Sequence, residues 1–174
     1  MEIKKLYNIN STQLKQVIDY HQNTFHEGLI TKLGYDFIQS YYENLLTLPE
    51  YSIYAAYFDN RMVGFIGFVL DQRKLENLIV FTNAKKIALK RMVTLQINPI
   101  IIVHDLKKKR LGRCVSGLPE LMMIAVEPDA RRFGIGSQLV SVMENDLIKH
   151  NLYQYCVYTD NPEGICFYKK LGFE

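Results

Sequence analysis

The sequence predicts a single mixed α/β domain. Its 174 residues, 48% of them hydrophobic, are enough for one domain with a proper core. Short apolar runs typical of strands alternate with segments of helical spacing, in the order β-α-α-β-β followed by β-α-β-α. Since no internal repeat or low-complexity tract divides the chain, we expect one domain over residues 1–174.

The first half of the chain begins with a strand and two helical stretches. Residues 2–7 predict the strand, and Asn10 or Ser11 is suited to cap the helix that follows. A second helical stretch is expected to break at Gly34 and to end before Pro49.

A β-hairpin is expected next. Apolar runs over residues 51–58 and 62–70 flank an Asp-Asn pair at 59–60, which predicts the turn. Gly64 and Gly67 weaken the second strand and mark either a bulge or a close approach of another backbone.

A basic segment follows at residues 73–113. It holds 11 of the 21 Lys and Arg residues and only two acidic residues, so it carries +9 against −6 for the rest. Helical spacing runs from about residue 75 to 95, as an insertion between the third and fourth strands. The charge favours an acidic partner, such as a phosphorylated substrate or an anionic surface, and a solvated helix face explains it equally well. Because aromatic residues are not interleaved with these charges, no nucleic acid is expected as a partner.

The stretch from residue 120 to 138 predicts a binding site for a pyrophosphate. An apolar run over 121–126 indicates a buried strand, and Arg131-x-x-Gly134-x-Gly136 opens a helix after it. Unpaired N–H groups of a first helical turn and the helix dipole attract anions, and glycines let a phosphate approach the backbone. Neither the third glycine of the dinucleotide fingerprint nor the Gly-Lys-Ser/Thr of a P-loop is present.

A second motif follows a strand-like run over residues 153–159. Asn161 and Pro162 are suited to begin a short helix, and Gly172 is suited to end it. Inside that helix lies a Phe-Tyr pair at 167–168.

These two motifs, in this order and at this spacing, resemble motifs A and B of the GCN5-related N-acetyltransferase (GNAT) superfamily. Motif A reads Arg/Gln-x-x-Gly-x-Gly/Ala, and motif B reads N-x-x-A-x-x-F-Y-x-x-x-G-F, with Gly164 here in place of its Ala. The resemblance implies the GNAT fold, a central twisted mixed sheet, mostly antiparallel and flanked by helices. It further implies that acetyl-CoA lies in the cleft between splayed strands 4 and 5.

The resemblance also implies a set of cofactor-binding residues for acetyl-CoA as co-substrate, and no metal. The pyrophosphate is expected on the turn, and the backbone of the preceding strand is expected to bind the pantetheine arm and polarise the thioester carbonyl. Asn161 is expected to contact the cofactor, although a helix cap explains it too. The complete set is Ile124, Ala125, Val126, Arg131, Arg132, Phe133, Gly134, Ile135, Gly136, Ser137 and Asn161.

Two residues are candidates for the proton transfers. Tyr168 stands where the family places the acid that protonates the leaving thiolate, and the alternative is a Tyr that only packs on the pantetheine. Glu120 aligns with the Glu that deprotonates the amine in the histone-acetyltransferase branch, and the alternative is an exposed carboxylate. His26 is a lesser candidate, and Glu127 is expected to be structural. With no Ser-His-Asp or Cys-His arrangement evident, direct transfer in a ternary complex is preferred over a covalent acyl-enzyme.

The resemblance implies acetyl transfer to a primary amine, and we expect that amine to belong to a small molecule whose identity the sequence does not give. Residues 24–34 resemble a bacterial subgroup linked to surface-carbohydrate pathways, which suggests an amino sugar. Three alternatives stay open: a protein or peptide N-acetyltransferase, a non-catalytic acetyl-CoA-binding regulatory module, and a membrane-surface adaptor acting through the basic segment, although a membrane is not the expected partner.

Location and association are predicted from the remaining features. Cys156 and Cys166 fall on apolar faces, so buried thiols are expected rather than disulfides or zinc ligands. No signal-peptide pattern and no apolar run of about 18 residues is apparent, which predicts a cytoplasmic protein. The family usually runs a further strand after motif B, whereas this sequence stops at Glu174. An unpaired edge would invite association, so a homodimer is a candidate.

Overall fold

The chain forms an open five-stranded sheet in the order β1-β2-β3-β4-β5. The computed structural model describes residues 1–6, 9–25, 28–75 and 117–173. Neighbouring strands are antiparallel from β1 to β4, and β5 pairs with β4 in parallel, which confirms the predicted mixed, mostly antiparallel sheet. The strands are β1 (Glu2–Lys5), β2 (Tyr51–Phe58), β3 (Arg61–Val69), β4 (Glu120–Val126) and β5 (Cys156–Val157).

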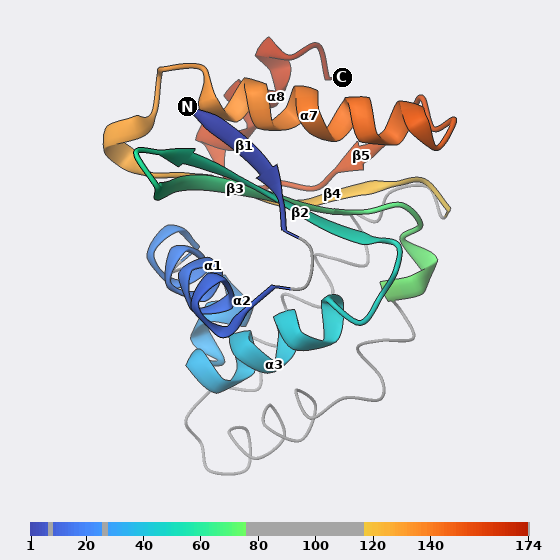
Figure 1. Ribbon diagram of the computed structural model, residues 1–174. Helices are drawn as coiled ribbons and strands as arrows, with labels where there is room; N and C mark the ends of the chain where they lie inside the picture. The colour runs from blue at the N-terminus through green and yellow to red at the C-terminus, as the bar shows by residue number, and fades with distance from the viewer. Residues whose placement is uncertain (7–8, 26–27, 76–116, 174) are drawn as a thin grey trace.

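Helices cover both faces of this sheet (Figure 1). One face carries α1 (Ser11–Thr24), α2 (Leu29–Lys32) and α3 (Tyr35–Leu45), and the other carries α7 (Ile135–Lys149) and α8 (Pro162–Lys170). A short 3-10 turn, η1 (Pro128–Ala130), connects β4 to α7. The predicted N-cap of α1 is confirmed, since the Asn10 side chain accepts a hydrogen bond from the Gln13 N–H in a capping box. Among the described residues, no helix is both long enough and apolar enough to span a bilayer.

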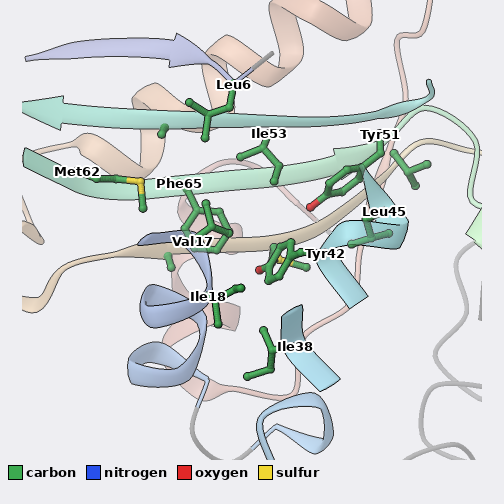
Figure 2. Packing of buried hydrophobic residues seen from close by; sticks show 14 residues of the cluster. Leu6, Val17, Ile18, Ile38, Tyr42, Leu45, Tyr51, Ile53, Met62 and Phe65 are labelled. Carbon is green, nitrogen blue, oxygen red and sulfur yellow. The ribbon is translucent and has the colours of Figure 1, made fainter. Parts of the chain in front are cut away.

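The core on the α1–α3 face joins these helices to the sheet. Figure 2 shows Tyr42 reaching from α3 toward Phe65 of β3, and Ile18 and Ile38 of the helices belong to the same buried cluster. A buried polar link runs through this core, where the Tyr42 hydroxyl lies 3.0 Å from His21 Nδ1 and donates to Met123 Sδ at 2.7 Å. The two helices are thereby attached to the middle of β4.

The hairpin and its irregularity agree with the sequence. Asp59 and Asn60 both have positive φ, 46° and 62°, as a tight hairpin turn requires. The predicted bulge occurs at the second glycine, because the β3–β4 register shifts between Gly67 and Phe68. Gly67 pairs with Met123 while Phe68 pairs with Leu121, so the extra residue is Met122 of β4. A bulge of this kind changes which face of the sheet the flanking side chains take.

The last strand is shorter than the sequence predicts. Residues 153–159 suggest a strand, but β5 spans only Cys156–Val157 and pairs with Glu120 and Leu121 alone. Beyond Leu121 the two strands diverge, so the following residues of both lose their ladder partner. The strand is short because β4 and β5 separate to form a cleft. The splayed arrangement implied by the family resemblance is confirmed.

The expectation of two buried thiols is wrong. Cys166 is a free but exposed thiol, because α8 buries only Tyr168 and turns Cys166 away from the core. Cys156 is disulfide-bonded and lies half-buried on the short edge strand β5. Residues 76–95 of the predicted helix and the candidate base His26 lie outside the described residues.

A largely buried ion pair attaches β1 to α7, the helix that begins at the predicted pyrophosphate turn. Lys5 Nζ lies 3.0 Å from Asp146 Oδ2, and only 7% of Asp146 is exposed. Burial by itself raises the pKa of Asp146. Hydrogen bonds from Lys5 and Tyr54 and the charges of Lys5 and Lys149 outweigh burial and hold that pKa below its ordinary value.

We expect Asp146→Asn to lower the free energy of unfolding by about 1–3 kcal/mol at pH 7. Because the pKa of Asp146 is lowered in the folded state, its contribution is present above the unfolded pKa of about 3.9 and is lost as the pH falls through the folded pKa. Urea titrations should show a clear difference between wild type and variant at pH 7 and a much smaller one at acidic pH. An equal difference under both conditions would assign the loss to packing rather than to charge.

Candidate active site

A cavity of about 990 Å³ opens where β4 and β5 diverge. Its walls come from β4, from the turn and first residues of α7, from residues 157–164, and from one side of α8. Thr24 and Phe25 also line it, from the end of α1 on the other face of the sheet. The cavity thus brings both sequence motifs into one space.

The turn between β4 and α7 has the geometry of an anion cradle. Arg132 and Gly134 both have positive φ, 68° and 77°, and left-handed residues in a turn are typical of backbone nests that bind anions. The first helical hydrogen bond runs from the Gln138 N–H to the Gly134 oxygen at 3.0 Å. The N–H groups of Ile135, Gly136 and Ser137 therefore precede the ladder of α7 and face the cavity end of the helix.

The two arginines of the turn differ in their contacts. Arg131 Nε donates to the Val126 oxygen at 3.1 Å, and its Nη1 lies 3.7 Å from Glu163 Oε2 at the start of α8. Arg132 also lines the cavity and forms no ion pair with any residue that the structure describes. Arg131 thus connects the two sides of the cavity mouth, while no described acidic residue neutralises the charge of Arg132.

The main chain of β4 offers hydrogen-bonding groups to the cavity at alternate residues. The Glu127 N–H bonds the Val63 oxygen at 2.9 Å, toward β3. Because successive residues of a strand point to opposite sides, the N–H and C=O of Val126 and of Ile124 point away from β3, toward the cavity. The backbone groups of Ala125 point toward β3. Of the three residues expected to hold the pantetheine, Ile124 and Val126 therefore present their main-chain groups to the cavity.

Asn161 begins α8 as its cap. Its Oδ1 accepts from the Glu163 N–H at 2.9 Å, and its own N–H donates to Thr159 Oγ1 at 3.2 Å. The same threonine explains the departure from motif B, because a Cβ on Gly164 would lie 2.8 Å from Thr159 Oγ1. Gly164 and Thr159 are therefore matched to each other at the cavity wall.

Tyr168 lines the cavity from α8, with only 8% of its surface exposed. Its ring packs edge-on against Phe167 and Phe173, at centroid distances of 5.2 and 5.4 Å. Burial raises the pKa of Tyr168 to about 12. Its hydroxyl is thus protonated at neutral pH, and it donates to no residue within the described ranges.

Two of the predicted site residues do not line the cavity. The Phe133 side chain projects into solvent. Glu120, before the bulge, takes the opposite face from Leu121 and lies near Tyr41 of α3, whose pKa is raised first by burial and then by the Glu120 charge. Glu127 forms an ion pair with Arg61, in keeping with the structural role predicted for it.

Several residues that line the cavity are absent from the sequence-based set, among them Thr24, Phe25 and Thr159. Thr159 has a local signal, since a hydroxyl two residues before Asn161 is suited to bond its N–H. Thr24 and Phe25 have none, because only the packing of α1 against the sheet brings them to the cavity. Nowhere in residues 1–6, 9–25, 28–75 or 117–173 do three or more His, Cys, Asp or Glu side chains gather as a metal site.

Comparison with solved structures shows the same fold at low identity. The chain is similar to the aminoglycoside N-acetyltransferase AAC(6')-Iy in complex with CoA, with 17% identity, a TM-score of 0.62 and coverage of 99% of this chain and 87% of that one. It is also similar to the aminoglycoside 6'-N-acetyltransferase AAC(6')-IG from Acinetobacter haemolyticus, with 15% identity, a TM-score of 0.66 and coverage of 100% of this chain and 91% of that one. A third similar structure is the ribosomal-protein-alanine N-acetyltransferase from Brucella melitensis biovar Abortus 2308, with 15% identity, a TM-score of 0.56 and coverage of 98% of this chain and 89% of that one.

No curated protein matches the chain at a significant level. The family model described as the acetyltransferase (GNAT) family, however, matches residues 14–173, nearly the whole chain and both motifs. Together with the open mixed sheet, its splayed strands and the turn before α7, this match shows that the chain belongs to the GNAT family of acetyl-CoA-dependent acetyltransferases.

Proposed function

We propose that this protein transfers the acetyl group of acetyl-CoA directly to a primary amine of a small molecule, an amino sugar being the first candidate. One observation carries the proposal: a single cavity holds the N–H groups of the turn, the open main-chain edge of β4 and Tyr168 with its hydroxyl. An anion site, a strand edge for an extended amide-bearing arm and a proton donor are what a CoA thioester requires.

Acetyl-CoA is expected to lie along the cavity in one direction. Its pyrophosphate accepts hydrogen bonds from the N–H groups of Ile135, Gly136 and Ser137, with Arg132 adding charge. The pantetheine arm pairs with the main chain of Ile124 and Val126 like an added strand. This path leads the thioester toward Tyr168 and leaves the end of the cavity near Thr24 and Phe25 for the acceptor.

The transfer needs three proton movements: one to the sulfur, one from the amine and one back to Tyr168. The neutral amine attacks the thioester carbonyl carbon, forming the C–N bond and placing negative charge on the oxygen, which a β4 N–H facing the cavity stabilises. The C–S bond then breaks, and the electron pair leaves on sulfur, which takes the proton of Tyr168. The nitrogen, which is positively charged after the attack, gives a proton to a base. The base then returns a proton to the Tyr168 phenolate, which restores the enzyme.

We propose that Glu120 serves as that base through a water molecule, since its side chain does not line the cavity wall. Glu120→Gln keeps the shape of the side chain and removes the base, so kcat should fall by roughly 10²-fold at neutral pH. Partial recovery is expected at alkaline pH, where more of the acceptor amine is already neutral. CoA affinity should not change.

Rate measurements over a range of pH test this role, and Glu127→Gln is the matched control because Glu127 pairs with Arg61 instead. If the Glu120 variant keeps the wild-type pH–rate profile, Glu120 is structural and the proton passes to another base or to bulk water.

A thiol-release assay identifies the acceptor. Amino sugars, nucleotide-linked amino sugars, aminoglycosides, polyamines and peptides with a free N-terminus are each supplied with acetyl-CoA, and free CoA is measured. Turnover with amino sugars or aminoglycosides supports the proposal, whereas turnover with peptides alone identifies a protein acetyltransferase. Binding of acetyl-CoA without turnover of any amine favours the regulatory module. A cytoplasmic location and a homodimer remain predictions.

A further inference from the structure

The aromatic ring of Phe133 lies exposed beside the anion cradle. With 76% of its surface in solvent, Phe133 is the most exposed large apolar side chain among the described residues. It stands between Arg132 and Gly134, the two turn residues with positive φ. Isolated exposed apolar residues are common, so position rather than exposure makes this ring informative.

A structural role does not account for the ring. A hydrophobic residue just before a helix cap often packs on the fourth helical residue and fixes the entry of the chain. Here the cap is Gly134 and the fourth helical residue is Gln138, a polar side chain, so this contact is not formed. Phe133 also belongs to neither of the two hydrophobic clusters of the core.

The position of the ring fits the nucleotide end of CoA, an inference that rests on the proposed function. When the pyrophosphate binds the turn and the pantetheine fills the cavity, the adenosine is left outside the mouth, on the solvent side of the same turn. Two residues of the turn are placed to meet it. Phe133 offers an aromatic ring, and Arg132 offers a guanidinium that has no ion pair with any described residue. A flat apolar surface next to a cation matches a base next to phosphates.

We propose that Phe133 is the stacking platform for the adenine of CoA. It makes the protein select donors that carry the whole nucleotide over donors that carry only a phosphopantetheine arm. Stacking of a base on an aromatic side chain does not require a particular hydrogen-bonding pattern, so one ring on an exposed turn is sufficient.

Fluorescence tests the stacking directly, because the chain contains no Trp. Phe133→Trp creates a single Trp at the turn, whose emission can be excited separately from that of Tyr, and Tyr153→Trp creates a control at a side chain that is equally exposed, at 75%, outside the cavity lining. CoA and adenosine 3′,5′-bisphosphate should quench the first variant and leave the second unchanged. Pantetheine 4′-phosphate, which lacks the adenine, should quench neither.

Calorimetry completes the test. Phe133→Ala should weaken CoA binding roughly 5- to 100-fold and leave binding of pantetheine 4′-phosphate unchanged, whereas Tyr153→Ala should change neither. Phe133→Leu should behave like the Ala variant, since it keeps an apolar side chain but has no ring. If wild type binds CoA while Phe133→Trp is not quenched and Phe133→Ala binds as tightly, the stacking platform is overturned and the cofactor site stands. If wild type does not bind CoA at all, the proposed function fails and this inference fails with it.

Discussion

Replacement of Tyr168 by Phe is expected to lower kcat by roughly 10²- to 10⁴-fold with little change in acetyl-CoA affinity. The substitution removes only the hydroxyl, and the ring can keep its edge-on packing against Phe167 and Phe173. The departing thiolate then lacks its proton donor, whereas the pyrophosphate and pantetheine contacts persist. Turnover should be measured under conditions in which chemistry limits the rate, and affinity by calorimetry.

The control is Tyr155→Phe. Tyr155 also packs on Phe173, at 5.2 Å, but its hydroxyl donates to Glu144 and it does not line the cavity, so its variant should turn over normally. Near-normal turnover of Tyr168→Phe would reduce Tyr168 to a packing role.

The pH dependence of the wild-type rate follows from the same residue. A general acid acts while it is protonated, and burial raises the pKa of Tyr168 to about 12. Its contribution is therefore present throughout the neutral range and is lost only as the pH rises toward that value. A decline of kcat between pH 8 and 10 that disappears in the Phe variant would contradict the raised pKa.

Replacement of Gly134 by Val is expected to weaken CoA binding by roughly 10²- to 10⁴-fold, the loss of one or two charge-assisted hydrogen bonds. Gly134 has a φ of 77°, which a β-branched residue rarely adopts, so the turn must change its path. In the free protein a Cβ at this position meets only Gln138 Nε2, at 3.9 Å, so there is space for the new side chain. We therefore expect the fold to persist and the anion cradle to be lost.

Calorimetry with CoA measures the effect, and thermal unfolding shows whether the variant is folded. Gly134→Asn is the informative companion, because Asn adds a Cβ but tolerates a left-handed backbone better than Val does. If Asn binds CoA nearly as well as Gly, the turn conformation matters most. If both variants bind poorly, the Cβ itself blocks the phosphate. A folded Gly134→Val that binds CoA with unchanged affinity would place the pyrophosphate elsewhere.

Several parts of the fold and of the candidate site could be predicted from local sequence. The positive φ at Gly134, the cap at Asn161 and the tight turn at residues 59–60 each follow from what those residue types allow the backbone to do. The two outcomes predicted for the glycines of this strand both occur, a bulge at Gly67 and a close approach of another backbone at Gly64, where a Cβ would lie 2.7 Å from the Ala125 oxygen.

Other features depend on partners that are distant in the chain. The strand predicted over 153–159 is mostly unpaired, because β5 meets β4 only at Glu120 and Leu121. An apolar pattern indicates that a segment can form a strand. It does not indicate over how many residues an adjacent strand will pair with that segment. The surroundings of Cys156 and Cys166 were wrongly predicted for the same reason, since an edge strand and a short helix each bury a single narrow face.

The sequence by itself determined the family, the order of the elements and the positions of the two motifs, because these depend on residue types at short spacing. Only the tertiary structure decided that Glu120 faces α3 while Tyr168 faces the cavity. For Glu120 the reason is the extra residue at Met122, which comes from pairing with Gly67 and Phe68, more than fifty residues earlier in the chain. A one-residue shift reverses the faces of a strand, and neither strand contains that information alone.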